Sequence, residues 1–115
     1  MNKGHLKSGE VINLEKPAKD MNAEATYALI RTEDMEVIRM VVPKGKTIAE
    51  HSVEGEVWVQ CLKGFVEFII ENRAQNLSKD DWLYLGKNVS HPLFTKEQTV
   101  LFLTILFTNH KEKSS

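Results

Sequence analysis

Two of the four histidines in this sequence stand where they could take part in chemistry. His51 and His91 each follow a turn-rich stretch in a strand-rich context, whereas His5 and His110 lie in polar terminal segments. Imidazole is the commonest metal-binding side chain, and it can also transfer a proton near neutral pH. Because metals in proteins usually take three or four protein ligands, two histidines alone predict an incomplete metal site.

The chain around these histidines has the composition of an ordinary globular domain. It has 115 residues, of which 42% are hydrophobic and 27% are charged, and its net charge is -1. A length of this size predicts one domain, and the near-neutral charge argues against a general nucleic-acid binder or an anionic membrane as partner. The first ten residues have no apolar core, so no signal peptide is predicted and we expect a cytoplasmic protein.

The hydrophobic pattern predicts strands nearly throughout. Turn signals separate short apolar runs every ~8–12 residues, which is typical of an all-β sandwich or barrel. A helical turn is conceivable at residues 17–24, and the polar tail 108–115 is expected to fray. The predicted strands span residues 11–14, 25–31, 36–42, 47–51, 56–62, 65–70, 74–77, 81–85, 89–94 and 99–107.

Side chains alternate between the two faces of a strand, so parity sorts the residues of each run. Within 56–62, Val57 and Val59 point to one face with Cys61, whereas Trp58 and Gln60 point to the other. Cys61 is the only cysteine, which excludes an intrachain disulfide, and its apolar run predicts a buried, unreactive thiol.

Two stretches of the sequence carry a resemblance to a known family. Residues 45–64 resemble the first motif of small cupins, which runs Gly, five residues, His-x-His, three or four residues, Glu, six residues, Gly. Residues 77–91 look like the second motif, which usually ends in Pro-x-Gly-x-x-His. The resemblance implies an all-β double-stranded β-helix, a jelly-roll barrel over about 36–107 within a single domain 1–115. The N-terminal strands, 10–31, are then expected to cover a face or to swap between subunits.

The departures from the motifs concern the metal ligands. Gly45 and Gly64 fit the first motif together with His51, but Val53 and Val57 stand where the family carries a histidine and a glutamate. Glu56 is adjacent to the glutamate position, and parity turns it away from the interior. In the second motif, Gly86 and Asn88 replace the usual proline and glycine, whereas the histidine is retained. The family's metal site is therefore carried over at two positions only, which are His51 and His91.

Three interpretations of this half-site remain open. In the first, a divalent metal (Zn, Ni, Mn or Fe) binds through the two histidines and a third group, and serves an isomerase, lyase or dioxygenase; the third group would be Glu54, Glu56 or Gln60. In the second, the barrel binds a small organic ligand without a metal, in a pocket lined by His51, Val53, Val57, Val59, His91, Trp82 and Tyr84. In the third, the chain uses only an interaction surface. The apolar wall slightly favours the second.

An outward tryptophan on a central strand predicts a partner that covers it. Trp58 faces outward when Val57 faces the lumen, and burial of such a side chain is a common feature of subunit interfaces. The sequence thus predicts a homodimer formed by sheet packing, with Phe65 and Ile69 as candidates to join the same patch.

Overall fold

The computed structural model describes residues 5–15, 25–49, 55–89 and 91–107. Within these ranges the chain forms strands and no helix, so no helix there is long and apolar enough to span a membrane. The strands are β1 (Tyr27–Arg31), β2 (Met35–Val42), β3 (Thr47–Ile48), β4 (Glu56–Lys63), β5 (Phe65–Ile70), β6 (Arg73–Ser78), β7 (Trp82–Leu85), β8 (Leu93–Thr95) and β9 (Thr99–Leu106).

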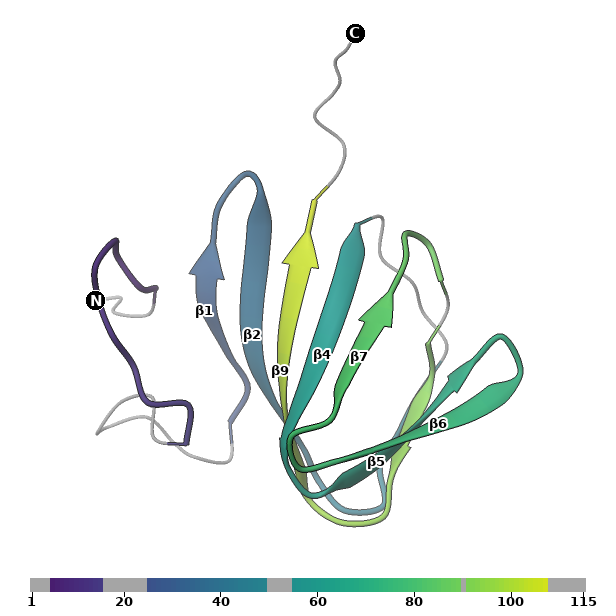
Figure 1. Cartoon of the computed structure of the whole chain (residues 1–115). Coiled ribbons are helices and arrows are strands. Elements are labelled where there is room, and N and C mark those ends of the chain that lie inside the picture. The colour runs from purple at the N-terminus through teal and green to yellow at the C-terminus, as the bar shows by residue number, and fades with distance from the viewer. Residues whose placement is uncertain (1–4, 16–24, 50–54, 90, 108–115) are drawn as a thin grey trace, which may run out of the picture.

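The strands form two sheets, and this confirms the predicted all-β architecture. One sheet has five strands in the order β1-β2-β9-β4-β7, and the other has four in the order β3-β8-β5-β6. Every ladder between described strands is antiparallel. Figure 1 shows the five-stranded sheet side by side, with β5 and β6 crossing near its lower end. Apart from β1–β2 and β5–β6, neighbouring strands are not consecutive in sequence, so the chain crosses between the two layers.

The hydrophobic core lies between the two sheets. Val57 and Val59 of β4, Leu101 of β9 and Phe68 of β5 belong to one cluster, and each is at most 2% exposed. Full burial of side chains of this size stabilises the fold by roughly 1.5–3 kcal/mol each. The remaining buried members of the cluster are Val42, Cys61, Val66, Leu77, Leu85 and Leu93.

Two motif glycines have structural reasons of their own. Gly64, between β4 and β5, has a φ of 93°, and a Cβ there would lie 2.3 Å from the carbonyl oxygen of Gln98. Gly45 has a φ of 74° with open space around it, so only its backbone conformation requires glycine. Both fit a barrel turn without any reference to a metal.

The predicted strand at residues 11–14 is wrong. This segment has no strand pairing, and Val11 is 93% exposed. Two hydrogen bonds tie the N-terminal segment to the sheet instead: the Leu6 amide donates to the Leu29 carbonyl at 2.8 Å, and Arg39 Nε donates to the Leu14 carbonyl at 3.2 Å. β1 pairs with β2 of the same chain, whereas the possible helical turn at 17–24 and the tail 108–115 lie outside the described residues.

Candidate ligand-binding site

The inner face of β4 forms an apolar wall, as parity predicted. Val57 pairs with Leu85 of β7, and Val59 pairs with Leu83. Val57 is 2% exposed and Val59 is 1% exposed, so both lie in the core between the sheets. Valine offers no donor atom to a metal or a polar ligand. This wall can therefore contribute only apolar contact.

His91 is one of the buried polar residues that the structure describes. Its side chain is buried, and its ring centroid lies 6.4 Å from that of Phe68. Nδ1 lies 3.0 Å from the Val89 carbonyl oxygen. Because a carbonyl oxygen only accepts, this contact requires a proton on Nδ1. The ring is thus oriented by the backbone beside an aromatic wall.

The second histidine of the predicted pair lies outside the described residues, as do Val53 and Glu54. The strand nearest to His51 in sequence is β3, and its Ile48 pairs with Leu93 of β8. Leu93 in turn follows His91 by two residues. The described register therefore joins the strand that precedes His51 to the strand that follows His91.

The other candidate metal ligands do not complete a site with His91. Glu56 and Gln60 lie on the outer face of β4, because they alternate with Val57 and Val59. Glu36 lies in the row of Ile105 and Val57, and its carboxylate is paired with Arg31 at 2.9 Å. Within the described ranges, no three His, Cys, Asp or Glu side chains gather closely enough to hold a metal ion. His51 and Glu54 lie outside these ranges, so this finding concerns the described donors alone.

Trp82 and Tyr84 need a correction, because they do not line the same space as Val57 and Val59. Trp82 pairs with Gln60, and Tyr84 pairs with Trp58, so these side chains share the outer face of the five-stranded sheet. Trp82 is 57% exposed and Tyr84 is 52% exposed. The Trp58 and Trp82 rings lie 5.9 Å apart between centroids. We call Trp58, Gln60, Trp82 and Tyr84 the aromatic patch.

A carboxylate joins the aromatic patch at its end. The Tyr84 hydroxyl donates a hydrogen bond of 2.8 Å to Glu56 Oε1. This hydrogen bond raises the pKa of the Tyr84 phenol above its ordinary value, because it favours the protonated phenol next to a negative charge. The acid that stands next to the cupin-like glutamate position is therefore engaged on the outside of the barrel.

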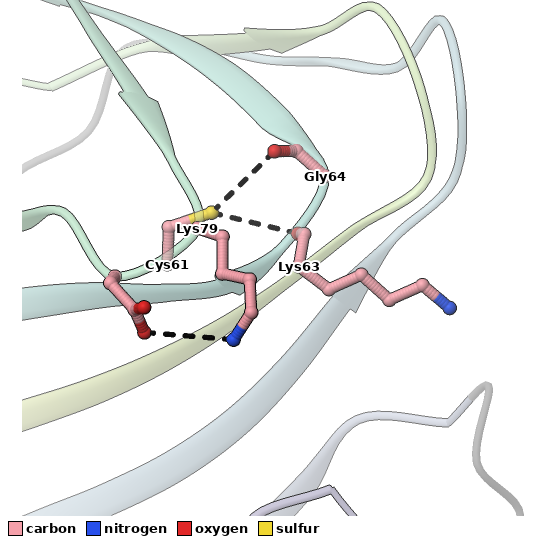
Figure 2. Close-up of polar contacts among 5 residues, drawn as sticks. Cys61, Lys63, Gly64 and Lys79 are labelled. Atoms are coloured by element: carbon pink, nitrogen blue, oxygen red, sulfur yellow. Dashed lines mark hydrogen bonds and ion pairs between the residues drawn. The ribbon is translucent and has the colours of Figure 1, made fainter.

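Cys61 is buried and inert at the opposite end of β4, as predicted. Figure 2 shows its Sγ directed at two backbone carbonyl oxygens, 3.5 Å from that of Lys63 and 3.9 Å from that of Gly64. Burial raises the pKa of the Cys61 thiol above its ordinary value. The nearby ion pair between Lys79 and Asp80, at 3.7 Å, is exposed. A buried thiol with a raised pKa is expected to be a poor nucleophile.

Several solved structures have an architecture similar to that of this chain. A cupin superfamily protein from Desulfitobacterium hafniense matches with a TM-score of 0.72 at 15% identity, over 84% of this chain and 95% of the other. An RmlC-like cupin family protein with a double-stranded β-helix fold from Methanocaldococcus jannaschii matches with a TM-score of 0.67 at 18% identity, over 85% and 93%. The chain has the cupin fold. A conserved protein of unknown function from Streptococcus pyogenes matches with a TM-score of 0.74 at 19% identity, over 90% and 91%.

These likenesses concern the cupin fold alone, since all three identities are below one fifth. No protein-family model and no curated protein sequence matches the chain. The predicted double-stranded β-helix is thereby confirmed. The activity of a cupin-fold protein has to be argued from its own residues, because one fold supports many functions.

Sequence reasoning missed two polar residues of the cupin barrel. Arg73 and Gln75 pair with Ile70 and Phe68 across the β5–β6 hairpin, so all four share one face of it. Ile70 and Phe68 pack in the core, which makes this the inner face. A two-residue turn at Glu71 and Asn72 would have predicted this pairing from the sequence. Their φ values of 52° and 68° fit such a turn. Such a turn places its two flanking residues opposite each other.

Proposed function

We propose that this cupin-fold chain binds a small organic ligand between its two sheets, at the end where His91 lies. The observation that supports the proposal most is the buried imidazole of His91 against Phe68, opposite an apolar wall. Ligand sites are typically apolar with a small number of placed polar groups. In this proposal, Val57 and Phe68 remove the body of the ligand from water, and the imidazole fixes its orientation.

We assign His51 to the same end of the barrel. Ile48 pairs with Leu93 in the ladder between β3 and β8. His51 follows Ile48 by three residues, and His91 precedes Leu93 by two. Three residues of chain span at most about 10 Å, so the two imidazoles can approach one ligand from neighbouring segments. Val53 would then add to the apolar lining.

A metal-dependent enzyme remains the second candidate function. His51 and His91 stand at histidine positions of the two cupin motifs, where the family binds its metal. Its third ligand would have to be Glu54, since Glu56 is hydrogen-bonded to Tyr84 on the outer face. A bound Zn, Ni, Mn or Fe ion would act as a Lewis acid or redox centre for an isomerase, lyase or dioxygenase. We rank this candidate below the metal-free pocket, because Val57 stands at the position of the cupin glutamate and cannot bind a metal.

We also propose that the chain forms a homodimer through the aromatic patch. Trp58, on the internal strand β4, and Trp82, on the edge strand β7, have tilted rings side by side on one face of the sheet. The amide of Gln60 lies on the same face. Interface centres are rich in Trp and Tyr and poor in charge, and this patch has that composition. Phe65 and Ile69 do not join it, because they belong to the four-stranded sheet.

The ligand proposal can be tested by NMR with a library of small organic fragments. We expect binding fragments to shift the amide resonances of Val57, Phe68 and His91. His91→Gln and His51→Ala should weaken that binding about tenfold, the size of one lost hydrogen bond to a fixed polar group. Tyr84→Phe, on the outer face, serves as the matched control and should leave it unchanged. Fragments that shift only outer-face resonances would contradict the proposal.

A further inference from the structure

Arg73, on the inner face of the barrel, has no ion-pair partner among the described residues. Arg73 lies opposite Ile70 in the β5–β6 ladder, and Ile70 packs against the core. Among the described residues, the Arg73 guanidinium has no ion pair or hydrogen bond, in contrast to Arg31, which holds Glu36 at 2.9 Å. A guanidinium beside apolar surface is the side chain best suited to hold a carboxylate, because its fork matches two oxygens.

The same register brings Arg73 into line with His91. β5 pairs with β8 through Phe68 and Leu93, and the Ile69 amide donates to the Pro92 carbonyl at 3.0 Å. The ladder ends at Leu93, and continuing its register by two residues puts His91 opposite Ile70. His91, Ile70 and Arg73 therefore form a row across three chain segments, which we call the mouth row. Adjacent strands are about 4.8 Å apart, so the backbones of Arg73 and His91, at the two ends of the row, are roughly 10 Å apart.

One row deeper, the chemistry changes from charged to apolar. Leu93, Phe68 and Gln75 occupy that row, and Phe68 is 1% exposed. Gln75 lies two residues from Arg73 on the same face of β6, and both side chains are exposed. A ligand that enters from the mouth row thus meets the guanidinium and the imidazole first, and the aromatic ring and the amide of Gln75 one row deeper.

The carboxylates of this hairpin do not cancel the guanidinium. Glu67 lies on the outer face of β5, since it alternates with Val66 and Phe68. Glu71 occupies the turn itself, and no ion pair joins it to Arg73. The inner-face acid of the other sheet, Glu36, is neutralised by Arg31.

From this arrangement we infer that the ligand of the barrel is a small organic acid, with its carboxylate on Arg73 and its apolar body against Ile70 and Phe68. The inference rests on the proposed function, because it names the chemical class that the same site accepts. His91 Nε2 then contacts a polar group near the carboxylate, and Gln75 supplies a further amide donor. A neutral ligand of the same shape would leave Arg73 unused.

Three matched pairs of probes test the inference: cyclohexanecarboxylate, benzoate and hexanoate, each against its neutral amide. We expect each acid to bind the full chain about tenfold more tightly than its amide, as measured by NMR titration of the Phe68 and Ile70 amides. Arg73→Gln should bring the ratio close to one, and Arg73→Lys should keep part of it. Lys79→Gln, which removes a positive charge just beyond the far end of the same strand, should leave the ratio unchanged.

The possible failures separate the two proposals. Equal binding of acid and amide to the parent chain would overturn the organic-acid class and leave the pocket in place. An acid preference that survives Arg73→Gln would overturn the role of Arg73. Inorganic phosphate that displaces the acids in an Arg73-dependent manner would show a bare anion site instead. Failure of every probe to shift inner-face resonances at about 10 mM would overturn the pocket as well.

Discussion

The two faces of β4 differ in burial and in chemistry. Val57, Val59 and Cys61 are at most 2% exposed on the inner face, whereas Trp58 and Gln60 are only partly buried on the outer one. A step of one residue thus separates the dry interior from an aromatic, hydrogen-bonding surface. Glu56, the acid next to the cupin glutamate position, therefore lies on the outer face, where it accepts a hydrogen bond from Tyr84.

On the inner face, His91, Arg73 and Gln75 are described polar residues near the mouth row, and the outer face carries the aromatic patch that we propose as a subunit interface. If this division is right, the same substitution on neighbouring residues of one strand must have opposite consequences. The predictions that follow begin with the largest expected effect.

A charge placed on either face of β4 gives the sharpest contrast. Val59→Asp buries an unpaired carboxyl group and should lower the free energy of unfolding by about 3–5 kcal/mol. Gln60→Asp places the same group at the partly exposed neighbouring position and should cost under about 1 kcal/mol. Urea unfolding followed by far-ultraviolet circular dichroism measures both. Similar losses for the two variants would break the comparison.

The aromatic patch should control association without controlling the fold. Trp82→Glu introduces a charge into the proposed interface and should weaken dimerisation by about 30-fold or more, since interface tryptophans often contribute above 2 kcal/mol. Light scattering at micromolar concentration should show the mass of two chains for the parent and of one chain for the variant. Ile69→Glu, on the outer face of the other sheet, is the matched control and should stay dimeric. A monomeric parent would refute the dimer.

Burial of Cys61 predicts a smaller, pH-dependent effect. Because its folded pKa is raised, the neutral thiol stabilises the fold below the unfolded pKa, and this contribution is lost as pH rises through the folded pKa. Unfolding free energies of the parent should therefore fall above pH about 8.5 more steeply than those of Cys61→Ala. The native thiol should also react with a thiol reagent far more slowly than the unfolded chain. Rapid labelling of the native protein would contradict its burial.

The hydrogen bond between Tyr84 and Glu56 predicts the smallest change. Glu56→Gln removes the negative charge that the phenol donates to, so the pKa of Tyr84 should move back down toward its ordinary value. Ultraviolet difference absorbance during an alkaline titration measures this shift, with Tyr27→Phe as background so that only one tyrosine contributes. An unchanged titration would mean that the two side chains do not interact in solution.

The sequence predicted the barrel well where alternation and turns were strong. The runs 36–42, 65–70 and 99–107 match β2, β5 and β9 within about one residue at each end. It failed at 11–14, where a short apolar run has no strand to pair with, and at 89–94, where β8 begins only at Leu93. Local composition reports propensity, and it does not report whether a partner strand is available.

The site was predictable only in part for a related reason. Parity within one strand placed Val57 inward and Trp58 outward. The register between strands decides that Trp82 stacks on Trp58 and that Arg73 shares a face with Phe68, and no single run contains that register. Parity within a single strand does not show which face of β7 lies on the same side as Val57. The prediction that Trp82 and Tyr84 line the pocket failed for this reason.

The central claim is that the interior of this barrel binds its ligand without a metal ion. The most direct test is the metal content of the chain purified without added metal and then dialysed against zinc, nickel, manganese or iron(II). Each sample is compared with the His51→Ala, His91→Ala double variant. We predict well under one ion per chain in the parent, with no difference from the variant. About one ion per chain in the parent, lost in the double variant, would contradict the claim.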